Sequence, residues 1–361
     1  MSNKKVPICD WFNTNEKEDD VITPIKSDSD IISIEDFESL IPSKIFNKMI
    51  NNQEILSKKN NVDFKTIKIN DNISDKDNKK EIYYRGEFNE QGQKDGIGKM
   101  IIINNKNEKI FYYGLWEEDS LNTGVIYYIN GEEYNGEMKN YLREGKGKFI
   151  SENEIYEGNW IKDKKEGFGI LEYKNGIKYE GNFKDNNFNG KGKIYFPNDI
   201  YYSGEFVNGL FHGQGFLKGN NNHIYNGNFK NGYYHGFGEF KWIDDMSMEI
   251  YKGNYVNGKK DGNGELKLKN DDIFKGNWES GNPHGEGIYE TKNRKYYGNW
   301  RAGLFIHLTS VEEKKDAEEE NFSLSFIIPE EDIKYQDDVF NSLYSNSSVN
   351  SKFVKGSIEK I

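Results

Sequence analysis

The chain has 361 residues, of which 30% are charged and 15% aromatic, and its formal net charge is −11. This charge divides into −3 for residues 1–81, −2 for residues 82–303 and −6 for residues 304–361. A central part so close to neutral lacks the basic stripe with which proteins bind nucleic acid, so we expect no nucleic-acid partner.

Targeting signals are absent from the sequence. No apolar run approaches the roughly 20 residues that span a bilayer, and no apolar stretch follows the first lysines as in a signal peptide. Ser2 excludes N-myristoylation, and the C-terminus has no cysteine for prenylation. The single Cys9 leaves no internal disulfide and fits the cytosol, with S-acylation as its alternative role. We therefore expect a cytoplasmic protein that is neither secreted nor transmembrane.

Residues 1–81 form an N-terminal flank with three candidate elements. The range Ser33–Leu40 predicts a short helix, and Val62–Ile69 alternates like a strand. Between them, Ser43 can cap a helix over residues 43–57. Its apolar side is formed by Ile45, Phe46, Met49, Ile50 and Leu56. This flank either caps the array that follows or binds a partner helix.

Residues 82–303 contain ten copies of one short pattern. Each copy reads aromatic-x-Gly-x-aromatic, and most have Gly-x-Gly about nine positions later. Successive copies are 22 to 28 residues apart, a period typical of a repeat array whose units are stable only when stacked. The first glycines of the ten copies are Gly86, Gly114, Gly136, Gly158, Gly181, Gly204, Gly227, Gly253, Gly276 and Gly298.

Each copy predicts a β-hairpin. Side chains alternate between the two faces of a strand, so Tyr202, Gly204 and Phe206 share one face. Asn208-Gly209 is a hairpin turn, and Gly213, Gly215 and Leu217 are then expected on one face of the second strand. Glycine at matched positions indicates a Tyr or Trp ring lying across the backbone.

The connections between hairpins also carry turn residues. These are Asn130-Gly131, Asn175-Gly176, Asn198-Asp199 and Asn270-Asp271. Both ends of every strand are therefore expected to turn sharply. The predicted fold is all-β: a single-layer antiparallel β-meander solenoid of about ten hairpins, with short, partly helical flanks.

The repeats resemble the MORN (membrane occupation and recognition nexus) family, on eight segments that are each followed by Gly-x-Gly. These are YRGEF (Tyr84–Phe88), YNGEM (Tyr134–Met138), YEGNW (Tyr156–Trp160), YEGNF (Tyr179–Phe183), YSGEF (Tyr202–Phe206), YNGNF (Tyr225–Phe229), YKGNY (Tyr251–Tyr255) and FKGNW (Phe274–Trp278). Two copies depart from the pattern: the one at Tyr112–Trp116 keeps only Gly124, and the one at Tyr296–Trp300 stops after Gly303.

The resemblance implies a β-hairpin solenoid, frequent self-association and a role at membranes or the cytoskeleton. It assigns a structural role to the aromatic and glycine residues of the repeats. These residues are Tyr84, Gly86, Phe88, Tyr134, Gly136, Tyr156, Gly158, Trp160, Tyr179, Gly181, Phe183, Tyr202, Gly204, Phe206, Tyr225, Gly227, Phe229, Tyr251, Gly253, Tyr255, Phe274, Gly276, Trp278, Tyr296, Gly298 and Trp300.

Residues 304–361 form an acidic linker, over 311–320, and a C-terminal tail or cap. Phe322–Ile328 reads as a strand and Asp338–Tyr344 as a short helix. Because the last copy has no Gly-x-Gly after Gly303, its hairpin is expected to be incomplete and its edge open. Open edges pair with other chains, so a homodimer through the C-terminal repeats is one expectation. A monomer with its edge shielded by the tail is the other.

No residues indicate catalysis, a cofactor or a metal. His212, His235 and His284 each precede a Gly-x-Gly, but equivalent residues of neighbouring repeats lie about 10 Å apart, too far to share a metal. Nucleophile, phosphate-loop and kinase motifs are absent. Lys164-Lys165 and Lys259-Lys260 are interpreted as solvated turn residues rather than a lipid site.

Three functions stay open at this point. The first is a non-enzymatic scaffold or adaptor that binds protein partners. The second is a module that binds phosphoinositides or a membrane surface, although such recruitment favours clustered lysines and arginines. The third is the regulatory or targeting subunit of a lipid kinase, a role that the resemblance alone suggests.

Overall fold

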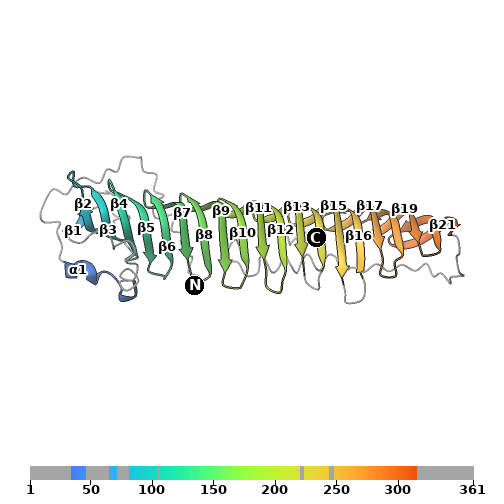
Figure 1. Ribbon diagram of the computed structural model, residues 1–361, viewed down its shortest axis with the longest axis horizontal. Helices are drawn as coiled ribbons and strands as arrows, with labels where there is room; N and C mark the ends of the chain where they lie inside the picture. The colour runs from blue at the N-terminus through green and yellow to red at the C-terminus, as the bar shows by residue number, and fades with distance from the viewer. Residues whose placement is uncertain are drawn as a thin grey trace. The chain divides into compact units, whose positions relative to one another are not determined.

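The computed structural model describes residues 34–45, 65–70, 81–104, 106–219, 223–243 and 248–314. The chain divides into two compact units, residues 1–174 and 175–361. Helix is limited to α1 (Ile34–Ser39) and a turn at 43–45 within these described ranges, and neither is long and apolar enough to cross a membrane. The remaining elements are strands, so the predicted all-β class is confirmed (Figure 1).

Within each unit the strands pair in chain order, each antiparallel to the next. The first unit contains β1 (Lys65–Asn70), β2 (Glu81–Phe88), β3 (Lys94–Ile103), β4 (Lys109–Glu117), β5 (Ser120–Tyr128), β6 (Glu133–Lys139), β7 (Leu142–Ile150), β8 (Glu154–Ile161) and β9 (Lys164–Tyr173). The second contains β10 (Lys178–Lys184), β11 (Asn187–Tyr195), β12 (Tyr201–Val207), β13 (Leu210–Lys218), β14 (Ile224–Lys230), β15 (Tyr233–Ile243), β16 (Met248–Val256), β17 (Lys259–Lys267), β18 (Ile273–Glu279), β19 (Asn282–Glu290), β20 (Arg294–Arg301) and β21 (Leu304–Glu313). The predicted β-meander is confirmed.

Two-residue turns close the hairpins. Between β12 and β13, Asn208 and Gly209 have φ angles of 50° and 83°. Positive φ at both central residues is the type I′ turn, whose twist matches that of the paired strands. Glu118 and Asp119 adopt the same conformation in a repeat without an Asn-Gly pair, with φ angles of 45° and 69°. The predicted hairpins therefore form even where the turn residues are less favourable.

The first glycine of each Gly-x-Gly differs from the sequence expectation. On β13, Gly215 pairs with Gly204 while His212 pairs with Glu205, so two residues of β13 have no partner on β12. One of them is Gly213, whose φ angle of 55° is disfavoured for residues with a side chain. Gly213 is thus the centre of a β-bulge and not a regular strand residue that shares a face with Gly215.

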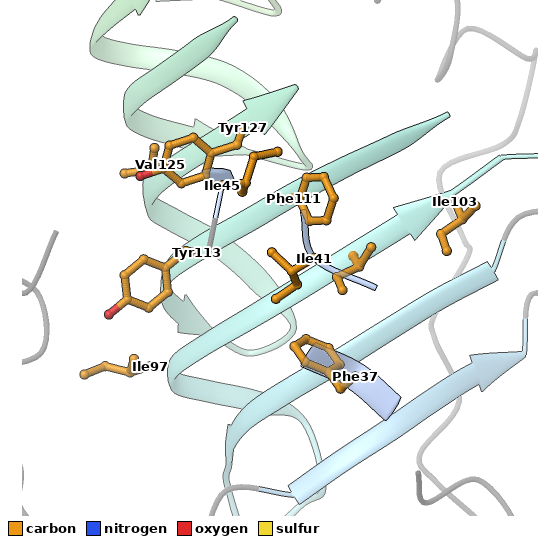
Figure 2. Packing of buried hydrophobic residues seen from close by; sticks show 10 residues of the cluster. Phe37, Ile41, Ile45, Ile97, Ile103, Phe111, Tyr113, Val125 and Tyr127 are labelled. Carbon is orange, nitrogen blue, oxygen red and sulfur yellow. The ribbon is translucent and has the colours of Figure 1, made fainter. Parts of the chain in front are cut away.

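The N-terminal flank packs on β3, β4 and β5. These strands are apolar on both faces, unlike the alternating strands of later repeats. Phe37, Ile41 and Ile45 from the flank cover the face opposite the repeat tyrosines, where they contact residues such as Ile101 and Phe111 (Figure 2). Strand β1 pairs with β2, on the other side of β2 from β3. Residues 46–57 of the predicted helix lie outside the described residues.

The last hairpin is complete, which corrects the sequence expectation. β21 pairs with β20 along its whole length without a Gly-x-Gly, and two register shifts take the place of the usual bulge. Leu308 stands opposite Gly298, where other repeats place a glycine. Residues 311–313 therefore belong to a strand and not to an acidic linker. The predicted elements Phe322–Ile328 and Asp338–Tyr344 lie outside the described residues.

Candidate functional site

The aromatic residues of the repeats form a buried row in each unit. Tyr202 has no exposed surface, and its ring contacts Phe206 of its own repeat and Phe229 of the next, with ring centroids 5.1 Å apart in both cases. Among the motif aromatics only Phe88 is half-buried. The buried ones are Tyr84, Tyr134, Tyr156, Trp160, Tyr179, Phe183, Tyr202, Phe206, Tyr225, Phe229, Tyr251, Tyr255, Phe274, Trp278, Tyr296 and Trp300. The row is a core and offers no surface to a partner.

The paired glycines make room for these rings. Gly204 and Gly215 face each other across β12 and β13, and the Tyr202 ring lies over both of them. A Cβ at Gly215 would come 2.5 Å from Tyr202 Cε2. The Tyr202 hydroxyl then donates a hydrogen bond to the Glu205 carbonyl, 2.9 Å away. The predicted fit of a ring over glycine backbone is therefore observed.

We expect Gly215→Ala to lower the free energy of unfolding by about 1–3 kcal/mol, because the added methyl overlaps the Tyr202 ring. In a Tyr202→Leu background the ring is gone, and the same substitution should cost under about 0.5 kcal/mol. Urea denaturation of the four proteins in this double-mutant cycle measures the difference. Equal costs in both backgrounds would show that the ring does not set the need for glycine.

The residue after each first glycine was missed by the sequence analysis. Asn159 donates through Nδ2 to the Phe168 carbonyl at 3.0 Å, and Asn254 does the same to the Asn263 carbonyl at 3.3 Å. Both carbonyls belong to the middle residue of a Gly-x-Gly, so the amide fastens the bulge. The signal was present in the sequence, because this position is Asn or Glu in nine of the ten copies and only Leu115 departs.

One position on the second strand packs against the repeat tyrosine in two different ways. Phe211 stacks on Tyr202, with ring centroids 3.8 Å apart and planes 12° from parallel. The equivalent Lys260 instead places its ammonium 5.1 Å from the Tyr251 ring centroid and 5.2 Å from that of Trp278. Lysines over aromatic faces are attracted by the ring quadrupole.

Two lysines that were interpreted as solvated turn residues are buried. Lys165 and Lys260 are 9% and 2% exposed. Lys165 forms a 2.6 Å ion pair with Glu154, and burial lowers the pKa of this lysine although Glu154 opposes the shift. Lys164 and Lys259 are exposed as expected. The buried lysines hold the array together and are unavailable to lipids.

The histidines are not brought together. His212 and His235 occupy equivalent positions on β13 and β15, while His284 pairs with Glu279 at 3.0 Å. In the described ranges, no group of three or more His, Cys, Asp or Glu could hold a metal ion.

The polar face of the second unit carries balanced charges. Glu239 pairs with Lys241 at 2.6 Å and with Lys252 at 2.8 Å, and Lys275 pairs with Glu265 at 3.2 Å. These lysines are neutralised by neighbours on adjacent strands, so they do not form the cationic cluster that anionic lipids attract.

The most unusual surface is the outer edge of β21. Leu304, Ile306, Leu308 and Val311 are 60%, 55%, 44% and 41% exposed. Within the part of the chain that the structure describes, β21 pairs with β20 alone. An edge strand with unpaired backbone groups and exposed apolar side chains is a template for strand addition. We refer to these four side chains and the free side of β21 as the β21 edge.

The β21 edge is held on a firm base. The Tyr297 hydroxyl donates to Glu312 Oε2 at 2.9 Å, and Lys314 Nζ pairs with Glu290 at 2.7 Å. On the inner side, the Phe305 ring packs against that of Trp300, with centroids 4.9 Å apart. The strand is therefore positioned before any partner arrives, which lowers the entropic cost of pairing with it.

Comparison with known proteins agrees with the repeat geometry. A family model described as MORN repeat matches residues 134–154, 156–178, 179–200, 202–224, 225–247, 251–273 and 274–294. Alsin from Rattus norvegicus and Homo sapiens is 33% identical over 97 residues, which are 25% of this chain and 6% of alsin. MORN repeat-containing protein 3 from Xenopus laevis is 39% identical over 59 residues, 15% of this chain and 25% of that protein. The matches thus span small parts of these relatives.

Proposed function

This chain is a MORN-repeat protein, and we propose that it acts as a non-enzymatic scaffold or adaptor that binds protein partners. MORN repeats support a role in protein or membrane interaction, and the adaptor role is our inference from the surfaces of this molecule. In this proposal the chain helps to organise a cytoskeletal or membrane-associated complex in the cytoplasm.

The observation that carries the proposal is the β21 edge. A partner segment in extended conformation can add to β21 as an antiparallel strand. Its backbone would supply the missing hydrogen bonds, and its alternate apolar side chains would cover Leu308 and Val311. The buried aromatic row and the buried lysines play no part in this binding, because they stabilise the repeats.

The competing membrane function has less support. Cations on the polar face of the second unit are paired with glutamates, as at Glu239. Pelleting of the full chain with phosphatidylcholine vesicles, with and without a phosphoinositide, tests it. Pelleting that requires the phosphoinositide would replace the scaffold proposal with a lipid-binding one, whether for the chain alone or as a subunit that targets a lipid kinase.

Proximity labelling in the native cell tests the scaffold proposal. We expect Leu308→Lys to remove a defined set of labelled proteins, because a charge on the β21 edge opposes strand addition. Val207→Lys is the matched control, since Val207 is a 41% exposed apolar residue of the same unit away from this edge. Identical labelled sets for both variants and the unchanged chain would contradict the proposed binding site.

A further inference from the structure

The β21 edge also fits a segment of this chain itself. We propose that residues 322–328 form an additional antiparallel strand on β21, so that a protein partner must displace this tail strand. The inference deepens the proposed function, since it concerns regulation of the same edge. It is carried by the repeat pattern, the exposed side chains of β21 and the path of the chain beyond Glu313.

The tail strand has the pattern of a first strand. Phe322-Ser323-Leu324-Ser325-Phe326 reads aromatic-x-Leu-x-aromatic, which is the repeat motif with leucine in place of glycine. Leu324 follows Gly298 by 26 residues, within the 22 to 28 residues that separate successive motif glycines. The segment therefore stands where the first strand of an eleventh repeat would begin.

Leucine is compatible with this position because the neighbouring glycine has also been replaced. Inside the array, Gly204 lies between Gly192 and Gly215 on the two adjacent strands. The tyrosine ring needs glycine on its own strand and on the one that follows. On β21, leucine already stands opposite Gly298, and in the described residues no further second strand follows. Leu324 beside Leu308 would fill the space with apolar side chains instead of a ring.

The chain leaves β21 in the right direction. The Lys314 backbone N–H donates to the Asn293 carbonyl at 2.7 Å, and Nζ of the same lysine donates to the Thr291 carbonyl at 2.8 Å. The end of β21 is thus fixed beside the connection between β19 and β20, on the rim where connections between repeats run. Eight residues, 314–321, then join Glu313 to Phe322. A linker of this length is ample for an antiparallel return.

The register follows from the other repeats. Second strands pair with the next first strand without a shift, as Gly215 does with Gly227 and Gly213 with Phe229. The same register places Leu308 opposite Leu324 and Ile306 opposite Phe326. Both exposed residues of β21 would then be covered. Because the tail is tethered, its effective concentration at the edge is in the millimolar range, and only a partner that pairs more tightly displaces it.

Disulfide trapping in the full chain tests the register. In a Cys9→Ser background, Leu308→Cys with Leu324→Cys places two cysteines directly opposite, at a Cα separation that a disulfide can bridge. The matched control is Leu308→Cys with Ser325→Cys, because a shift of one residue turns the second thiol to the other face. We expect an intramolecular bond in the first pair that forms at least about tenfold faster than in the control.

The result is measured on non-reducing gels, with the mass of the species from light scattering. Equal rates in the two pairs, or no bond in either, would overturn the tail strand. Bonds between two molecules in place of bonds within one would overturn it too, and would identify a second copy of the chain as the occupant of the edge.

Hydrogen exchange separates this inference from the proposed function. We expect Leu324→Asp with Phe326→Asp to speed exchange of the outward amides of β21 by at least about tenfold, whereas Ser323→Asp with Ser325→Asp leaves them slow. Fast exchange already in the unchanged chain would contradict the tail strand and leave the partner-binding edge intact. Slow exchange together with partner labelling that ignores Leu308 would instead support the tail strand and contradict the scaffold site.

Discussion

Trp160→Ala is expected to lower the free energy of unfolding by about 3–5 kcal/mol. Trp160 is 2% exposed, and its ring lies edge-on to Tyr134 and Tyr156, with centroids 5.6 Å and 5.0 Å away. Its Nε1 donates to the Gly147 carbonyl at 3.2 Å, and Arg143 lies 4.1 Å from the ring centroid. Removal of the ring therefore leaves a cavity, an unpaired carbonyl and a guanidinium without its aromatic partner.

Chemical denaturation of the two variants and the unchanged chain checks this expectation. Phe168→Ala is the control, because Phe168 lies in the same unit and is 57% exposed. Its loss should change stability by no more than about 0.5 kcal/mol. If the two alanine variants are equally stable, Trp160 is not part of the core and the assignment of faces is wrong.

Alkaline pH is expected to unfold the array cooperatively. Burial raises the pKa of Tyr113 and of Tyr128 to about 12, from an ordinary value of 10.0. Burial also raises the pKa values of the motif tyrosines. Because unfolding restores the ordinary value, the unfolded chain binds fewer protons above pH 10 than the folded one. Stability is thus complete below about pH 10 and falls as the pH rises through 12, by roughly 1.4 kcal/mol per pH unit for each buried tyrosine.

Absorbance of tyrosinate and far-ultraviolet circular dichroism, recorded through the same titration, check this prediction. Buried tyrosines should ionise together with the loss of β structure, above pH 10. Burial lowers the pKa values of Lys94 and Lys165, and these lysines act in the opposite direction as the pH rises. They are fewer than the tyrosines, so the net effect is still a loss of stability. Complete tyrosine ionisation near pH 10 with the fold intact would contradict the buried row.

The sequence by itself determined the repeat, the hairpin and the packing of rings over glycines. Each depends on residues close together in the chain: the alternation of Tyr202, Gly204 and Phe206, and the turn at Asn208-Gly209. Local alternation specifies which side chains share a face, and Asn-Gly specifies a type I′ turn, so both strands and their pairing follow without knowledge of the rest of the molecule.

Only the tertiary structure decided which polar and apolar residues depart from that pattern. Gly213 and Gly215 look alike in the sequence, but pairing with β12 leaves the first in a bulge and the second under a ring. Lys165 and Lys260 resemble turn residues until rings from the adjacent strands surround them. Burial and bulging depend on the strand that lies alongside, about 22 to 28 residues away in the chain, and not on the local pattern.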